Sequence, residues 1–165
     1  MCKAKLDDEY LRYVIKSCLI LVASNYARVK TTFINREKVN EVLQSLRGSV
    51  FFKDGTCSED EARSSILDCA KNVEGNLEKS GFAIFAVNLM LKRLAPFFDD
   101  KHVELLDAPL NRKELEMVGA KEFGIDRMSA VDQSNYESLM KLAHKHATKC
   151  GAKSLYQWEL EVYNE

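Results

Sequence analysis

Apolar residues recur along most of the chain at intervals of three or four, the spacing that returns side chains to one face of an α-helix. The first such segment follows Asp7 and Asp8, whose carboxylates can accept hydrogen bonds from the free backbone N–H groups of a helix start. The pattern predicts a first helix with one buried stripe, formed by Leu11, Val14, Ile15, Cys18, Leu21 and Val22.

Residues that cap helices mark the later helix starts. Helices are predicted to begin at Asn35, at Ser58 or Thr56, at Asp99 or Asp100, at Asn111 and near Val131. Ser58 and Glu61 have the spacing of a capping box, in which each side chain bonds the backbone of the other residue. Gly48 stands where a left-handed residue would end the second helix, and the β-branched and aromatic run 31–34 predicts an extended interruption before it.

Residues 82–95 form the most apolar segment, in which only Asn88, Lys92 and Arg93 are polar. A helix that is apolar nearly all round must be enclosed by other elements. Asn88 and Lys92 are four residues apart and would share a narrow polar strip, with the Lys92 ammonium reaching water. The pattern predicts a buried central helix that ends at Pro96.

Two short segments fit either a helix or a strand. Residues 49–52 could form a brief strand or an apolar plug. In the segment 155–162, apolar residues at the even positions alternate with polar ones, as in a half-buried strand. Ser154 and Gln157 nevertheless have capping-box spacing, and the helical context favours a helix there.

Composition supports a helical globular fold. The chain has 165 residues, of which 46% are hydrophobic and 30% charged, and only 7 are glycine and 2 proline. So few turn residues favour long helices over many short strands. We predict one all-α, or nearly all-α, domain spanning 1–165, a bundle of six to eight helices around 82–95.

The cysteines and the apolar segments bear on location. Cys2, Cys18, Cys57, Cys69 and Cys150 are scattered and form no C-x-x-C pair, which favours reduced and mostly buried thiols. The apolar run 18–23 is far shorter than the roughly 20 residues of a membrane span. The opening residues contain no apolar segment typical of a secretory signal. A cytoplasmic protein without a membrane partner is therefore expected.

The charge is unevenly distributed. The net charge is −1, but residues 1–53 hold ten Lys and Arg against five Asp and Glu, a balance of +5, which leaves −6 for 54–165. Arg28, Lys30, Arg36 and Lys38 are the candidate contacts for a partner or a nucleic acid. Exposed glutamates on the second helix would oppose phosphate binding, which makes a nucleic acid the less favoured partner.

The stretch KDGTCSEDE, residues 53–61, resembles part of a calcium loop. With Gly55 at loop position 6, Asp54, Ser58 and Glu61 fall on ligand positions. Positions 1 and 3 fall on Val50 and Phe52, which have no side-chain oxygen. A turn followed by a capped helix explains the stretch better than a cation site does.

Other chemistry finds little support in the sequence. His146 and Cys150 could share a helix face, but a zinc site needs three or four ligands, and His102 and His144 have no matching spacing. No nucleophile elbow or glycine-rich phosphate loop is present. No catalytic residue, metal ligand or cofactor is therefore assigned.

The leading functional hypothesis is a non-catalytic protein-binding or regulatory module. The first alternative is an enzyme whose site is assembled from residues distant in sequence, and the second is a nucleic-acid-binding protein that uses the basic N-terminal face. The oligomeric state stays open, because a second copy could also cover an apolar helix.

Overall fold

The computed structural model describes residues 6–164, and every regular element in that range is helical. The all-α prediction is therefore confirmed, whereas Cys2 lies outside the described residues. The α-helices are α1 (Asp8–Val22), α2 (Arg36–Gly48), α3 (Glu59–Lys71), α4 (Ser80–Leu94), α5 (Asp100–Glu104), α6 (Arg112–Met117), α7 (Gln133–Lys149) and α8 (Leu155–Asn164). Single turns join them: η2 (Ala23–Ala27, π-helical) and the 3₁₀ turns η3 (Thr31–Phe33), η4 (Val50–Phe52), η5 (Ala95–Phe97), η6 (Ala120–Phe123) and η7 (Met128–Ala130).

Local capping sets most of the helix starts. The Asp7 carboxylate accepts a hydrogen bond from the Glu9 N–H at 3.1 Å. Ser58 and Glu61 form the expected capping box at the start of α3. Side-chain caps also begin α2, α5, α6 and α7, and the capping residues are Asn35, Asp99, Asn111 and Asp132. Each cap satisfies backbone N–H groups that have no partner within the helix.

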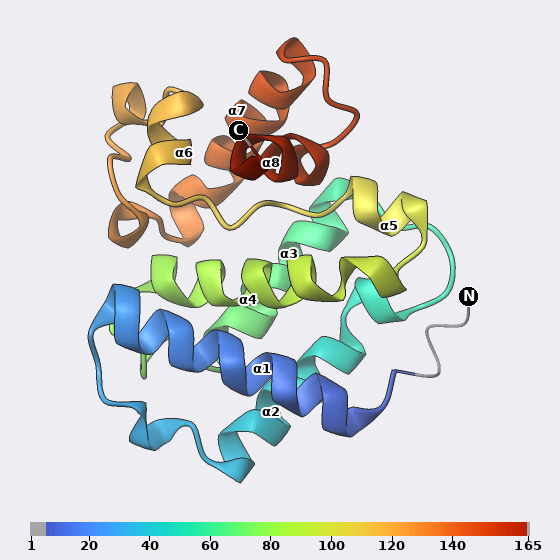
Figure 1. Cartoon of the computed structure of the whole chain (residues 1–165), viewed down its shortest axis with the longest axis vertical. Coiled ribbons are helices and arrows are strands. Elements are labelled where there is room, and N and C mark those ends of the chain that lie inside the picture. Colours follow the sequence, from blue (N-terminus) through green and yellow to red (C-terminus); the bar gives the residue numbers. More distant parts are fainter. Residues whose placement is uncertain (1–5, 165) are drawn as a thin grey trace.

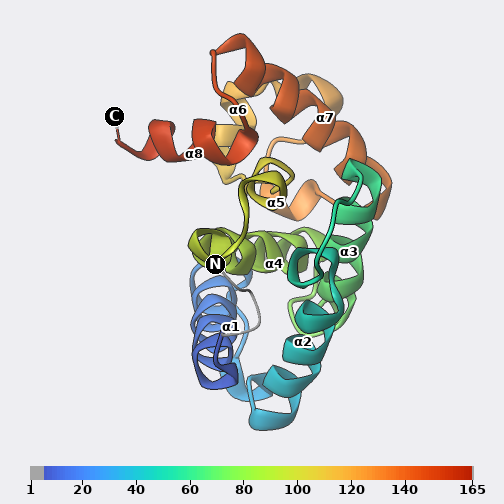
Figure 2. The ribbon, with the colours of Figure 1, turned by 90° about the vertical axis from the view of Figure 1, so that its right-hand side faces the viewer.

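Helix α4 is the centre of the structure, as the apolar segment 82–95 predicted. Ten of its fifteen residues are buried. Figure 1 shows α4 between two layers, with α1 and α2 on one side and α6, α7 and α8 on the other. Figure 2 shows α3 running past both layers, from beside α2 to beside α7. Because neighbours enclose it on both sides, α4 has almost no polar face.

The close approach of η7 to the start of α4 depends on Gly81. A Cβ atom at Gly81 would lie 1.9 Å from the Met128 carbonyl oxygen and 2.9 Å from that of Val131. Only a residue without a side chain allows this backbone contact. The contact joins α4 to the segment that leads into α7.

Neither of the two possible β segments is a strand in the described residues, and the helix favoured for the tail is confirmed. Ser49 is extended, but Val50–Phe52 forms a 3₁₀ turn in which the buried Phe51 ring stacks on Phe98 at 5.9 Å, so this segment is the apolar plug. The tail is α8, because Ser154 accepts a hydrogen bond from the Gln157 N–H at 3.1 Å. Within residues 6–164 neither segment has a strand beside it, and local hydrogen bonds satisfy their backbones instead.

Two local predictions also need correction. The run 31–34 is not extended, since η3 coils it into a 3₁₀ turn. Gly48 is the last helical residue of α2 and not a left-handed terminator, because Ser49 closes the helix with its N–H on the Leu46 carbonyl. The helix predicted to begin at Asn111 is the short α6, which is followed by Gly119 in a left-handed conformation at φ 78°.

The stretch 53–61 forms a turn followed by a helix start. Gly55 has φ 107°, a backbone conformation that side chains disfavour. Glu61, the acid at loop position 12 of the calcium alignment, accepts hydrogen bonds from the N–H and hydroxyl groups of Ser58. These bonds to Ser58 lower the pKa of Glu61. Its carboxylate therefore serves the helix cap.

Candidate interaction surface

The structure separates the four predicted basic residues into two environments. Arg28, Lys30 and Arg36 are exposed and form no ion pair with the residues that the structure describes. Lys38 is partly buried, with its Nζ 2.5 Å from Glu41 Oε2 and 3.0 Å from the Asn72 carbonyl. Three of the four side chains are therefore available to a partner, and Lys38 is occupied within the chain.

A groove of about 420 Å³ lies between α1 and the start of α2. Its lining comprises Glu9, Arg12, Tyr13, Lys16, Ile34, Asn35, Arg36 and Val39. The helical repeat of α1 brings residues 9, 12, 13 and 16 to one side, while the Asn35 cap holds the first turn of α2 opposite them. We call this feature the α1–α2 groove.

The charge in the α1–α2 groove is positive. Arg12 donates from Nη1 to Glu9 Oε1 and from Nε to Asn40 Oδ1, both at 3.0 Å, so Glu9 balances that guanidinium. Lys16 and Arg36 are exposed, and no carboxylate pairs with either of them within the described part of the chain. Two uncompensated cations thus flank the apolar side chains of the groove.

Exposed aromatic and aliphatic side chains continue from the groove along α1. Tyr13 is 67% exposed, and Tyr10 and Ile20 are each 40% exposed. The Tyr10 ring lies 6.5 Å from that of Tyr13 and makes an edge contact at 5.6 Å with Phe97. These side chains leave large apolar surfaces in water on the side of α1 that faces away from the core.

A second set of polar residues is buried between the two layers. Asp107, in the segment between α5 and α6, is 2% exposed. Its Oδ2 accepts a hydrogen bond from the Tyr136 hydroxyl at 2.7 Å, and its Oδ1 lies 3.0 Å from His144 Nε2. The Tyr136 oxygen in turn accepts a hydrogen bond from Asn88 Nδ2 at 2.9 Å. We call these residues, together with Arg63, the Asp107 cluster.

Arg63 supplies the compensating charge in the Asp107 cluster. Its Nε lies 3.9 Å from Asp107 Oδ2, and its Nη2 donates to Glu59 Oε2 at 3.4 Å. Burial raises the pKa of Tyr136 well above its usual value, and the adjacent Asp107 carboxylate adds to the effect. The cluster joins α3 and α7 through the Asp107 carboxylate and reaches α4 through the Tyr136 hydroxyl, which gives it a structural role in the packing of the layers.

Lys92 forms an ion pair that its position did not predict, while 22% of its side chain stays exposed. Its Nζ lies 2.5 Å from Oε1 of Glu159, a buried residue of α8. Burial raises the pKa of Glu159, although the hydrogen bond from Lys92 opposes that shift. Glu159 falls among the polar positions of the tail, and that pattern does not indicate an ion pair between α4 and α8.

The cysteines and histidines do not converge on a metal site in the described residues. Cys18 and Cys69 are buried, Cys57 is partly buried and Cys150 is exposed. Burial raises the pKa of the Cys18 thiol to about 11. Cys150 Sγ lies 3.6 Å from His146 Nε2, and the His146 ring packs edge-on against Trp158. His102 is buried and lies 2.6 Å from Asp99, and His144 belongs to the Asp107 cluster.

Sequence reasoning found Arg36 but missed the other main residues of the α1–α2 groove. The signal for Tyr13 was present in the helical pattern, because it lies off the stripe formed by Leu11, Val14 and Cys18. Apolar residues on a second side of a helix require a second cover. No pattern in the sequence indicates that the residues of the Asp107 cluster meet, because they are separated by up to 81 positions, from Arg63 to His144.

Comparisons with known proteins identify no relative: no family model, no curated protein and no solved structure matches the chain. Within residues 6–164, no helix combines the length and apolar character needed to cross a bilayer.

Proposed function

We propose that this protein is a binding module whose α1–α2 groove receives an acidic segment of another protein. The observation that carries the proposal is the combination of exposed Tyr13 with two exposed cations, Lys16 and Arg36, around one groove; neither cation pairs with a carboxylate among residues 6–164. Aromatic and arginine side chains are enriched at protein interfaces because they provide large contact areas and directed hydrogen bonds.

The lining of the groove defines the chemistry of the partner. Ile34 and Val39 offer an apolar surface for an aliphatic or aromatic side chain. Lys16 and Arg36 would pair with carboxylates on either side of that side chain. The occupant we propose is therefore a peptide segment with one apolar residue between acidic ones.

A nucleic acid is the less favoured occupant of this surface. Basic and aromatic residues together also bind single strands, where bases stack on flat rings. Here Glu9 lines the groove, and the exposed Glu37 and Glu41 lie on the helix that carries Arg36. These carboxylates would repel a continuous phosphate backbone, whereas a short acidic peptide can place its charges between them.

The Asp107 cluster bears on the enzyme alternative. An Asp–His pair can serve acid–base chemistry, and His144 is the most exposed member, with 26% of its side chain accessible. Asp107, Asn88 and Tyr136 are each at most 2% exposed, which shields the rest of the cluster from a substrate. The geometry favours internal packing over catalysis.

A fluorescein-labelled peptide that alternates glutamate with leucine provides the test, with fluorescence anisotropy as the readout. We expect saturable binding that weakens with salt, and a roughly tenfold loss of affinity in the double variant Lys16→Glu, Arg36→Glu. Tyr13→Ala should also weaken binding. Charge reversal at Lys145, an exposed cation on α7, is the matched control and should leave affinity unchanged.

Two results would overturn the proposal. One is equal binding of the peptide by the wild type and the double variant. The other is stronger binding of a labelled single-stranded oligonucleotide than of the peptide, with a steep salt dependence that the double variant abolishes.

A further inference from the structure

The outer side of α1 carries a second helical pattern. Tyr10, Tyr13, Ser17 and Ile20 follow one another at intervals of three, four and three residues, which places them along one side of the helix. The three apolar members are exposed, on the side away from the buried stripe. At about 1.5 Å per residue the four positions span about 15 Å. We call them the outer row of α1.

The spacing of the outer row is that of a contact between two helices. Intervals of three and four residues are those of the a and d positions of a heptad, which pack against a second helix. Tyr13 and Ile20 are seven residues apart, so two turns of a partner helix would cover both. In Figure 1, α1 crosses the front of the molecule between α4 and α2, which pack against its other sides.

Cations border the outer row on both sides. Lys16 borders it on the side of α2, where Arg36 lies across the α1–α2 groove. On the side of α4, Arg93 Nη1 donates a hydrogen bond to the Ser17 hydroxyl oxygen at 2.7 Å. Arg93 is exposed, and no carboxylate pairs with it in the described part of the chain. An apolar row between two positive borders is complementary to an apolar row between two negative ones.

We infer that the occupant of this surface is an amphipathic helix whose apolar side covers the outer row and whose two flanks are acidic. This inference rests on the proposed function, because the same helix would place an apolar side chain in the α1–α2 groove beside Tyr13. It adds the conformation of the partner segment and extends the contact to Ile20 and Arg93, neither of which lines the groove. One acidic flank would pair with Lys16 and Arg36, and the other with Arg93.

The three cations disfavour a second copy of this chain as the occupant. A two-fold contact pairs one patch with itself, so Lys16, Arg36 and Arg93 of one copy would approach the same cations of the other. These like charges would repel one another, whereas an acidic helix would neutralise them.

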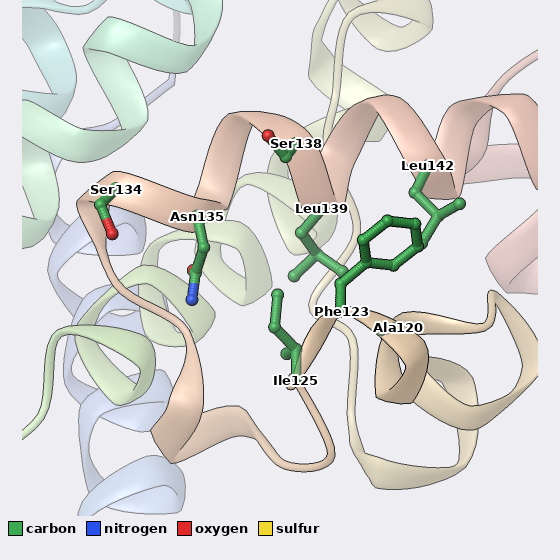
Figure 3. Close-up of a pocket in the computed structure, with 8 residues that line it drawn as sticks. All are labelled: Ala120, Phe123, Ile125, Ser134, Asn135, Ser138, Leu139 and Leu142. Atoms are coloured by element: carbon green, nitrogen blue, oxygen red, sulfur yellow. The ribbon is translucent and has the colours of Figure 1, made fainter.

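A second apolar hollow provides a contrast in charge. Figure 3 shows a pocket of about 230 Å³ between η6 and α7, in which Phe123 of η6 lies near Leu139 and Leu142 of α7. All of its lining residues are uncharged, so it offers no partner to an acidic flank. Phe123 is 69% exposed, close to the 67% of Tyr13. Phe123→Ala is therefore the matched control for Tyr13→Ala.

Two fluorescein-labelled peptides of equal length and composition distinguish a helical partner from an extended one. One has leucines at intervals of three and four among glutamates, which gives an amphipathic helix, and the other alternates the two residues. In fluorescence anisotropy we expect the helical peptide to bind the full chain at least about tenfold more tightly, because it also covers Ile20. Tyr13→Ala should weaken both peptides, and Phe123→Ala neither.

Ile20→Glu and Arg93→Glu test the part of the contact that lies outside the groove. Each should weaken binding of the helical peptide by roughly tenfold and leave the alternating peptide unchanged, because the alternating peptide contacts the groove alone. Met117→Glu is the matched control for Ile20→Glu, since both side chains are 40% exposed, and it should change neither affinity.

An exchange of charge tests the pairing with Arg93 directly. Two further versions of the helical peptide carry lysines in place of glutamates, one version on each flank. One of the two should bind Arg93→Glu more tightly than it binds the wild type, because opposite charges then meet again. Misfolding of the variant would not produce such a gain.

The outcomes separate this inference from the proposed function. Equal affinity of the helical and alternating peptides for the wild type, with both lost in the variant Lys16→Glu, Arg36→Glu, would overturn the helical partner and leave the groove proposal intact. Binding of neither peptide would overturn both. Full binding of the helical peptide by Ile20→Glu and Arg93→Glu, or a dimer of the chain that Ile20→Glu abolishes, would also overturn the inference.

Discussion

Replacing Gly81 with alanine tests the packing of η7 against α4. The added Cβ would lie 1.9 Å from the Met128 carbonyl oxygen, so the backbone must retreat by roughly 1.5 Å to reach ordinary contact at 3.4 Å. That retreat is opposed, because the Asn135 side chain holds the Ala130 carbonyl at 2.9 Å from the first turn of α7. The obstacle is backbone and not the end of a flexible side chain.

The expected change in the free energy of unfolding on Gly81→Ala follows from two opposing effects. Overpacking costs about 1–3 kcal/mol, and contact with fixed backbone places this substitution in the upper part of that range. Alanine recovers at most about 1 kcal/mol through its helix propensity. We expect Gly81→Ala to lower the free energy of unfolding by about 2 kcal/mol, which corresponds to a fall in Tm of about 4–8 °C at this chain length.

Gly48→Ala is the matched control. Gly48 also lies in a helix, its φ is not left-handed, and a Cβ there would meet nothing within 4 Å. The control should raise stability by about 0.5–1 kcal/mol. Urea denaturation followed by circular dichroism measures both variants. If Gly81→Ala proves as stable as Gly48→Ala, the close approach of η7 to α4 is refuted.

Three further predictions concern the buried residues. Asp107→Asn should lower the free energy of unfolding by about 3–5 kcal/mol in urea denaturation, because it leaves the buried Arg63 guanidinium with only the exposed Glu59 as a counter-charge. Tyr136→Phe should cost less, about 1–3 kcal/mol for the lost hydroxyl, and the reverse order would contradict the geometry of the cluster. Phe85→Ala should lower the free energy of unfolding by about 3–5 kcal/mol, since the ring is only 7% exposed, and an effect near zero would contradict its burial. The pKa of Glu159 is raised in the folded state, so the folded state binds a proton more readily than the unfolded state does. The stability that this protonated side chain contributes is therefore present below about pH 4.5 and is lost as the pH rises through the folded-state pKa. The stability of the wild type relative to Glu159→Gln should therefore fall with rising pH over that interval, and a difference that stays constant with pH, or rises, would contradict the shift.

The sequence predicted those parts of the fold that depend on neighbouring residues. Asn35, Ser58 and Asp99 cap helices through bonds to backbone groups within three positions, so their effect is visible in the sequence. The tail was ambiguous because its alternation also suits a strand. A strand needs a partner that local pattern cannot supply, and in the described part of the chain the Ser154 cap determines the outcome.

The candidate site was predictable only in part. Arg36 was identified by charge, and it lines the groove. Lys38 appeared equivalent to Arg36, yet its ammonium bonds Asn72, which lies 34 positions away. The partner of Lys92 could not be predicted for the same reason, because Glu159 comes from a helix 67 positions later. Contacts between distant segments depend on the packing of the layers, which periodicity does not specify.

The position of α4 has a consequence for how the molecule comes apart. Helices α1 and α3 and the turn η7 pack against α4. Asn88 of α4 also bonds Tyr136 of α7, and Lys92 bonds Glu159 of α8. Separating the layers would expose α4 to water, so neither layer is expected to open alone before the other loses its support. The slowest-exchanging amides should therefore lie in α4, and their exchange should report the global free energy of unfolding. In this sense the molecule behaves as one cooperative unit, and its middle helix is the last part to lose protection.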